Sequence, residues 1–371
     1  MKLLWIAAVV CCAIAATANA QAAAKDAVYP TKPIRFVVPF AEGGAPGLVS
    51  RRPVRGQGAQ AAGFYPVAVT ITPSYPTKPI RFVVPFAPGG GTDIIGRIVA
   101  QLLHEALGQP VVVDNRAGAG SSVGTDIAAK APPDGYTLLL GNISLAFNPA
   151  LYRKLSYDAL TDLAPVTLVA VQPNIVVIFP GLAATTIGEF AALARAKPGQ
   201  IAYASAGVGA GTHLAGVMLE QILKIELLHV PYKGTGPALT DVMGGQVHMM
   251  VSTFASALPH VKSGRLRALG VTSAKRSGAT PDVPTLMEAG VPGYDYSTWY
   301  GLLVPARTPR AIVNQLHRKT LKVLAEEDAK RKLEAQGVET ITNTPAEFSA
   351  YLKSETAKWT GVVRAAGIAP Q

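Results

Sequence analysis

The chain has 371 residues, of which 34 are Lys or Arg and 23 are Asp or Glu, so its formal charge is +11 (34 minus 23). Hydrophobic residues make up 49% of the chain and charged residues 15%, a composition that excludes disorder of the whole chain. Beyond residue 20 no apolar run approaches the roughly 18 residues that a membrane-spanning helix needs, which excludes a polytopic membrane protein.

The first residues are typical of a secretory signal peptide. An apolar stretch at 3–16 follows Lys2, and Ala18-Asn19-Ala20 supplies the small residues that a signal peptidase reads. We therefore expect cleavage after the last of these and export to the periplasm. Both cysteines, Cys11 and Cys12, fall within this segment, so the exported protein would have no disulfide and no thiolate metal site.

A block of sequence is duplicated. Residues Tyr29 to Ala41 recur unchanged as Tyr75 to Ala87, an offset of 46 residues (75 minus 29). Only the second copy continues into a glycine-rich turn and an apolar stripe at helical spacing, Ile94 to Leu107. We therefore expect 21–74 to be a poorly ordered N-terminal segment with a degenerate duplication, and the working domain to start at Tyr75.

From Tyr75 onward, strand and helix patterns alternate, which predicts an α/β fold with mainly parallel sheets. The expected strands are Ile80–Pro85, Val111–Asp114, Thr137–Gly141, Leu163–Val171, Ile175–Phe179, Ile201–Ala204, Leu227–Val230, Val247–Ser252, Leu266–Thr272 and Trp299–Pro305. Further helices are expected at Ser122–Ala131, Ile187–Ala196, Thr212–Ile222, Pro237–Met243, Pro309–Glu326, Glu327–Gln336 and Pro345–Ala365. The apolar run from Val166 to Ala184 is interrupted at Gln172-Pro173-Asn174, and we interpret it as two strands.

Three glycine-rich turns, at 88–93, 116–124 and 205–212, each lie between an expected strand and an expected helix. Glycine lets the backbone approach a ligand, and the unpaired amides at a helix start suit a carboxylate or a phosphate. No turn has the full dinucleotide-binding spacing, and a Walker motif is absent. Each turn could also be a plain tight connection.

Residues for catalysis or metal binding are sparse. The six histidines show no metal-type spacing, no Ser lies in a Gly-x-Ser-x-Gly elbow, and no carboxylate pair stands out as acid and base. His213 is near a candidate ligand loop, and we expect a structural role for it. Because basic residues of the C-terminal helices alternate with acids, we also expect no nucleic-acid binding, and we expect no metal and no cofactor.

Six motifs occur in a characteristic order: Ile80–Asp93, Val111–Gly118, Pro133–Leu139, Tyr203–Gly207, His229–Gly234 and Pro281–Thr285. Together they resemble the Bug family of periplasmic solute receptors, the binding component of tripartite tricarboxylate transporters. The resemblance covers the chain from Tyr75 to the C-terminus.

The resemblance implies a type II periplasmic-binding-protein fold, with two α/β lobes joined by crossing strands. Lobe 1 would comprise 75–168 and 272–371, and lobe 2 would comprise 169–271. The lobes would close on a small carboxylated solute without chemistry, so the protein would be no enzyme. It would act as a monomer and deliver the solute to the subunits of a membrane transporter.

The resemblance also implies two ligand loops. The first contains Phe86, Ala87, Pro88, Gly89, Gly90 and Asp93, and the second contains Ser205, Ala206, Gly207, Gly209 and Thr212. Ser144 would lie in a polar stretch that faces the ligand. Ser252 stands where many family members have an aspartate, which suits a ligand without a cationic group. Lys233 could contact an anion or lie at the surface or hinge.

Two other functions remain open from the sequence. One is an exported hydrolase or isomerase that uses Ser205 and His213. The other is a ligand sensor that signals to a membrane partner, since sensing and transport need the same two-lobed receptor.

The first prediction concerns the N-terminal duplication. Deletion of 21–74 should leave the free energy of unfolding and ligand affinity unchanged, because only the second copy leads into an amphipathic helix that can be buried. Urea unfolding of the deletion variant checks this. A loss of several kcal/mol would show that the first copy forms the strand in the folded protein.

Overall fold

The computed structural model describes residues 75–365 and residue 370. The expected signal peptide, both cysteines and the first copy of the duplicated block lie outside the described residues. The second copy supplies β1 (Ile80–Val84), whose side chains are mostly buried. Within the described residues, no helix is both long and apolar enough to cross a membrane.

The described strands form one ten-stranded arrangement in the order β2-β1-β3-β9-β4-β7-β5-β6, and both β8 and β10 pair with β4. Neighbours β1, β2 and β3 are parallel, as are β5, β6 and β7, whereas β9 and β4 run antiparallel to their neighbours. The strands are β1, β2 (Val111–Asn115), β3 (Thr137–Asn142), β4 (Leu163–Ile178), β5 (Ala202–Ser205), β6 (Leu228–Pro231), β7 (Met249–Thr253), β8 (Arg267–Val271), β9 (Ser297–Pro305) and β10 (Glu339–Thr340).

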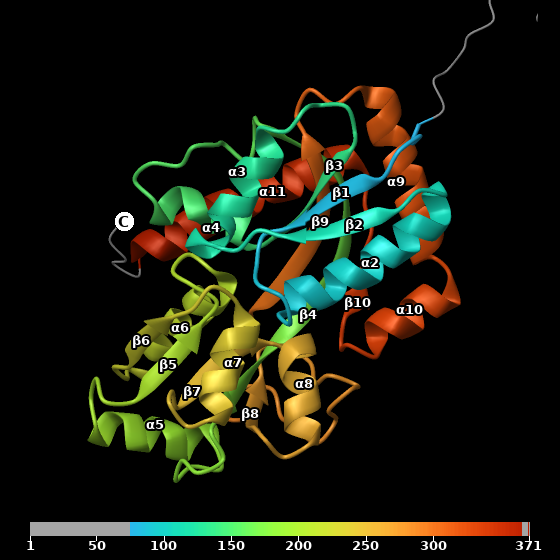
Figure 1. Ribbon diagram of the computed structural model, residues 1–371. Helices are drawn as coiled ribbons and strands as arrows, with labels where there is room; N and C mark the ends of the chain where they lie inside the picture. The colour runs from blue at the N-terminus through green and yellow to red at the C-terminus, as the bar shows by residue number, and fades with distance from the viewer. Residues whose placement is uncertain (1–74, 366–369, 371) are drawn as a thin grey trace, which may run out of the picture. The chain divides into compact units, whose positions relative to one another are not determined.

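Strand β4 is shared by two groups of strands (Figure 1). Its first part, through Pro173, pairs with β9, and its last part, from Asn174, pairs with β7 and β8. We call β1, β2, β3, β9 and their helices lobe 1, and β5 to β8 and their helices lobe 2. The interpretation of Val166 to Ala184 as two strands is therefore wrong. Proline has no amide hydrogen for a ladder, and Pro173 is tolerated because it lies where β4 changes partners.

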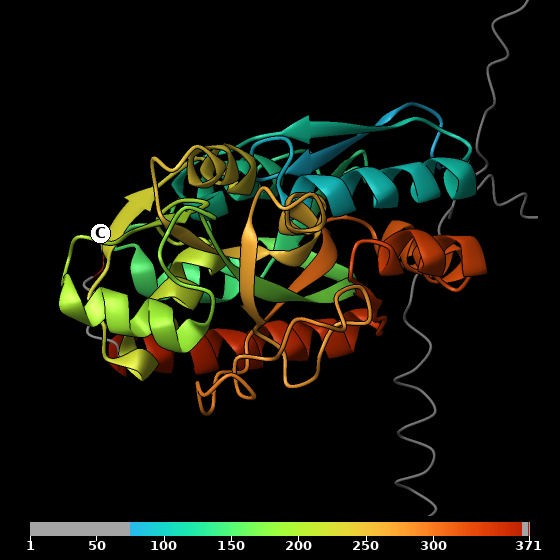
Figure 2. The same cartoon turned by 90° about the horizontal axis from the view of Figure 1, so that it is seen from below.

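In each lobe, helices cover both faces of the sheet. They are α2 (Gly91–Leu107), α3 (Ser122–Ala129), α4 (Ser144–Leu151), α5 (Ile187–Ala196), α6 (Gly211–Leu223), α7 (Thr235–Met243), α8 (Phe254–Lys262), α9 (Arg310–Leu324), α10 (Glu327–Glu334) and α11 (Pro345–Ala365), with a short 3₁₀ turn at Ala119–Ser121. In lobe 1, α2, α9 and α10 pack on one face of the sheet, and α3, α4 and α11 pack on the other. Figure 2 shows α11, in dark red, and α2, in light blue, on opposite sides of the molecule. In lobe 2, α7 and α8 lie opposite α5 and α6.

The apolar stripe predicted after the second copy forms the buried face of α2. Ile95, Val99, Leu102 and Leu103 are at most 3% exposed. Burying each such side chain contributes about 1.5–3 kcal/mol. The helix ends at Gly108, whose φ of 68° is left-handed and whose amide donates to the carbonyl of His104. This packing fixes the start of α2, and with it the glycine-rich turn before it.

Two helices were not expected from the sequence. Both α4 and α8 contain a proline, Pro149 and Pro259, and both follow directly on a strand. Proline normally opposes a helix interior, so the local signal argued against them. Their apolar faces are buried in the cores of the two lobes, which outweighs the local preference.

Candidate functional site

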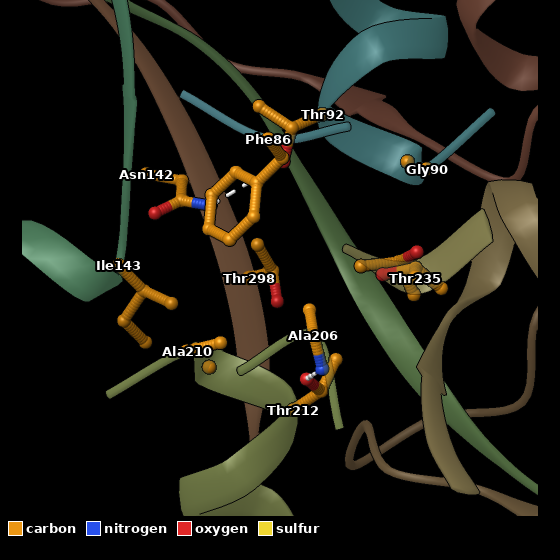
Figure 3. A pocket seen from close by; sticks show the side chains of 13 residues that line it. Phe86, Gly90, Thr92, Asn142, Ile143, Ala206, Ala210, Thr212, Thr235 and Thr298 are labelled. Atoms are coloured by element: carbon orange, nitrogen blue, oxygen red, sulfur yellow. Dashed lines mark hydrogen bonds between the residues drawn. The ribbon is translucent and has the colours of Figure 1, made fainter. Parts of the chain in front are cut away.

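A narrow cavity lies between the two lobes, and its empty space, including the part that is open to solvent, is about 330 Å³. Figure 3 shows the side chains that line it. From lobe 1 come Phe86, Gly90, Gly91, Thr92, Asn142, Ile143 and Thr298, and from lobe 2 come Ala206, Ala210, Gly211, Thr212, Thr235 and Thr253.

Three helices start at this cavity. Gly91, Gly211 and Thr235 are the first residues of α2, α6 and α7, and all three line the cavity. The first amides of a helix have no acceptor within the helix, and they carry the positive end of its dipole. Because the three helices come from both lobes, the cavity favours an anion that both lobes can hold.

The lining carries no charge of its own. None of the described residues that line the cavity has an ionisable side chain. An anion would therefore be held by backbone amides and hydroxyls, as at other helix N-termini. A buried ammonium group would find no carboxylate to pair with, and such burial is costly. The lining therefore offers no carboxylate partner to a ligand with a cationic group.

Most hydroxyls of the lining are already hydrogen-bonded within the protein. Thr212 Oγ1 accepts from the amide of Ala206 at 2.8 Å, and Thr298 Oγ1 donates to Asn174 Oδ1 at 2.8 Å. Thr235 is only 4% exposed, and its hydroxyl makes no hydrogen bond with any other described residue. The Thr235 hydroxyl is thus available to a ligand at the start of α7.

The lobes meet closely around the cavity, and two glycines make this possible. A Cβ on Gly91 would lie 2.6 Å from Thr253 Oγ1 across the lobe boundary. A Cβ on Gly120 would overlap the backbone of the second ligand loop, and its φ of 56° also favours glycine. Tyr152 Oη reaches across the same boundary and donates to the Val208 carbonyl at 2.7 Å. The structure is therefore one in which the lobes touch.

The sequence-predicted site residues divide into two groups. Phe86, Gly90, Ala206 and Thr212 line the cavity. The cavity lining does not include Ala87, Pro88, Gly89, Asp93, Ser144, Ser205, Gly207, Gly209 or Ser252. Two members of this second group, Asp93 and Ser205, stabilise the two ligand loops by hydrogen bonds on the side away from the cavity.

Asp93 holds the first loop in place. Its carboxylate accepts hydrogen bonds from the Gly89 amide and from Asn115 Nδ2, both at 3.0 Å, and forms an ion pair with Arg97 at 3.0 Å. Burial opposes ionisation, but the hydrogen bonds from Arg97, Gly89 and Asn115 outweigh it and lower the pKa of Asp93 below its usual value. Asp93 is thus ionised and engaged with the protein, which leaves the amides of the loop to face the cavity.

Ser205 holds the second loop in the same indirect way. Its Oγ accepts from the Gly207 amide at 3.1 Å and lies 2.7 Å from Nε2 of His229. His229 stacks on His213 with ring centroids 4.3 Å apart, and His213 Nδ1 accepts from the Gly209 amide at 3.4 Å. Burial lowers the pKa of His213 to about 4, and burial together with His213 lowers the pKa of His229 to about 3. Both rings are therefore neutral near pH 7.

The other predicted residues lie next to residues that line the cavity. Ser144 begins α4 directly after Ile143, and its amide donates to Asn142 Oδ1 at 3.0 Å. Ser252 donates to the carbonyl of Thr253 at 3.0 Å, and Thr253 is the residue that reaches the cavity. The side chain of Lys233 is exposed, and its carbonyl accepts from the Ala87 amide at 3.4 Å.

Several lining residues lie within stretches that the sequence had indicated without being singled out there: 91, 92, 210 and 211 in the loops at 86–93 and 205–212, 142 and 143 in the stretch at 141–145, and 253 next to Ser252. Sequence reasoning missed the lining residues at 235 and 298 altogether. Thr235 had a usable signal, because it follows Gly234 at a strand-to-helix turn of the same kind as the other two loops. Thr298 had none, since it lies within β9 and reaches the site only because β9 pairs with β4.

A second, larger groove, with an empty volume of about 2,020 Å³, is lined by parts of both lobes next to the middle of β4. Its charged side chains are of both signs: Lys262, Lys275, Arg276, Lys330, Glu334 and Glu339. The described residues contain no group of three or more His, Cys, Asp or Glu that could hold a metal ion.

The sequence matches the family described as tripartite tricarboxylate transporter family receptor over residues 95–368. It is 40% identical, over 94% of this chain and 90% of the relative, to a protein encoded between tcbD and tcbE in Pseudomonas sp. strain P51. It is 38% identical to protein BugT of Bordetella pertussis, over 95% of this chain and 94% of the relative.

Solved structures show the same architecture. The periplasmic binding protein BugD is 35% identical, with a TM-score of 0.78, and the match covers 80% of this chain and 100% of BugD. An R. palustris protein solved with adipate is 34% identical, with a TM-score of 0.78 and the same coverage. MatC from Rhodopseudomonas palustris with bound malate is 31% identical, with a TM-score of 0.75, over 78% of this chain and 100% of MatC.

The second prediction concerns Asp93. At pH 7, Asp93→Asn should lower the free energy of unfolding by about 1.5–3 kcal/mol, the usual worth of hydrogen bonds to a charged group. The pKa of Asp93 is lower in the folded protein than in the unfolded chain. The stabilisation is therefore complete above the unfolded pKa of about 3.9 and is lost as the pH falls through the folded pKa.

Urea unfolding at several pH values measures this. Asp282→Asn is the matched control, because Asp282 is exposed. An equal effect of the two substitutions at pH 7 would contradict the assigned role of Asp93.

Proposed function

The chain belongs to the tripartite tricarboxylate transporter receptor family, and from this premise we propose that it binds a small organic carboxylate and delivers it to a tripartite-type membrane transporter. The resemblance to the Bug family and the two-lobed fold with crossing strands, both predicted from the sequence, are confirmed. The family is one of periplasmic binding receptors and not of enzymes, so the hydrolase or isomerase alternative is set aside.

The observation that carries the proposal is the convergence of helix starts on an uncharged cavity. The starts of α2 and α7 lie close together across the lobe boundary, where a Cβ on Gly90 would lie 3.5 Å from the Cβ of Thr235. A carboxylate in the cavity beside these two helix starts would receive hydrogen bonds from both lobes and would favour their contact. Binding and closure would thus be one process.

A second anion position would lie at the start of α6. Gly211 and Thr212 line the cavity there, with Phe86 and Ala206 among the other lining residues. Two positive helix ends and a partly apolar lining suit an acid with a carboxylate at each end. The solved relatives with adipate and with malate support this assignment, because both ligands are diacids.

We propose that the two lobes expected from the sequence, 75–168 with 272–371 and 169–271, move about the middle of β4, with the boundary on this strand at Pro173, where β4 changes partners. Export through the N-terminal signal peptide would place the receptor in the periplasm as a monomer. A sensing role would use the same closure, and a membrane partner would then read it.

The third prediction tests ligand class. Succinate and adipate should raise the thermal midpoint, since a ligand that binds only the folded state at 100 times its Kd adds about 2.7 kcal/mol. Aspartate has the carbon skeleton of succinate with an added ammonium group, so it should give a smaller shift at the same concentration. Differential scanning fluorimetry followed by calorimetric titration measures both. No shift with any organic acid would contradict the proposed function, and a larger shift with aspartate would contradict the proposed selectivity.

The fourth prediction concerns Gly90. Its φ of −84° is open to any residue, and a Cβ there would make contacts of only 3.5–3.6 Å, so Gly90→Ala should fold and bind. Gly90→Asp places a negative charge at the site and should weaken binding at least tenfold, about 1.4 kcal/mol. Gly90→Asn has the same shape without the charge and is the matched control. Equal affinities of the Asp and Asn variants in calorimetry would rule out an anion at this position.

A further inference from the structure

Gln172 lies directly behind the cavity without lining it. It is fully buried on β4, next to Pro173, where the strand leaves lobe 1 and enters lobe 2. A Cβ on Gly91, which does line the cavity, would lie 3.2 Å from Gln172 Nε2. Leaving the amide of such a buried side chain without hydrogen bonds would be costly.

The two ends of the Gln172 amide bind different lobes. Its Nε2 donates to the hydroxyl of Tyr300 on β9 in lobe 1, and its Oε1 accepts from the amide of Ala255 at 3.3 Å. Ala255 lies in the first turn of α8 in lobe 2, so its amide has no acceptor within its own helix. One side chain thus connects the sheet of lobe 1 to a helix start of lobe 2.

The two partners of the Gln172 side-chain amide, Ala255 and Tyr300, each lie next to residues that line the cavity. Thr253, which lines the cavity, immediately precedes α8, and its Oγ1 is 2.8 Å from Ser256 Oγ within the first turn of that helix. On the other side, burial raises the pKa of Tyr300, while hydrogen bonding with Gln172 and Thr92 acts in the opposite direction. Thr92 lines the cavity and accepts from Asn142 Nδ2 at 3.3 Å. Gln172 is therefore the common neighbour of cavity residues in both lobes.

We propose that Gln172 is a positioning residue for ligand binding, which couples the two lobes by holding the start of α8 against the start of α2 from behind the cavity. This inference rests on the proposed binding function. In the touching arrangement, the amides of α2 and the hydroxyl of Thr253 face the same cavity. Without the Gln172 bridge, the α8 amide loses its acceptor and the two cavity walls lose one of the contacts that hold them together.

Gln172→Met tests the bridge, because Met has a similar volume and cannot make either hydrogen bond. The Kd for succinate should rise on the order of tenfold, mainly through faster dissociation, because the touching arrangement is the state that is lost. The ligand-free radius of gyration from X-ray scattering should be larger than that of the wild type. Tyr300→Phe removes only the lobe 1 end of the bridge and should give a smaller rise in Kd.

Gln315→Met is the control for general stability. Gln315 is a glutamine on α9 whose Nε2 donates to the carbonyl of Tyr75 at 2.6 Å. It should lower the thermal midpoint without changing Kd or the dissociation rate. The inference is overturned if Gln172→Met lowers the ligand-free midpoint while Kd, the dissociation rate and the radius of gyration match the wild type. If the wild type binds no acid, the proposed function fails, and the radius of gyration of ligand-free Gln172→Met still decides the role of Gln172.

Discussion

A single strand that serves two lobes is the constraint on which the rest of the structure depends. β4 pairs with β9 through Pro173 and with β7 and β8 beyond it, so the backbone of one strand sets how both lobes are placed. Strand β4 has little freedom to slip, because a one-residue shift would exchange its side chains between two faces that are both packed in the core. The polar side chains at the crossing are tied to both lobes: Gln172 to Tyr300 and Ala255, and Asn174 to Thr298. Movement of the lobes must therefore pass through these contacts.

The fixed crossing brings the helix starts of both lobes to one cavity. Each helix is held from behind, α2 by its apolar stripe and by Asp93, and α6 by the Ser205, His229 and His213 contacts. The charged and ionisable groups are thus used to shape the loops, while backbone amides and a free Thr235 hydroxyl face the cavity. Backbone dipoles cost little to reorganise when an anion enters, and their positive ends disfavour a cation. Under the proposed function, this arrangement would select for the sign of the ligand's charge without a charged side chain in the cavity lining.

Much of this arrangement could be predicted from the sequence. The alternation of strands and helices and the glycine-rich turns before α2 and α6 follow from local patterns, and the family follows from the motif order. The third predicted turn, at 116–124, leads into α3 and supplies none of the cavity lining. The errors of prediction from the sequence had physical causes. Pro173 predicted a break in β4, and Pro149 and Pro259 predicted that no helix forms where α4 and α8 lie. In each case burial of the apolar side chains outweighed the local preference of proline against regular structure. Ser205 and Asp93 have the residue types of ligand contacts, yet each is engaged with the protein. Thr298 reaches the cavity through strand pairing alone, which no local pattern reveals.

The central claim is that uncharged backbone at converging helix starts holds the anion. Amide nitrogen and proton chemical shifts during a titration with succinate test it most directly. The account predicts that the largest shifts occur at Gly91, Thr92, Gly211 and Thr235, at the starts of α2, α6 and α7 in both lobes. Shifts confined to the groove with Lys262 and Lys275, with these helix starts unchanged, would contradict it.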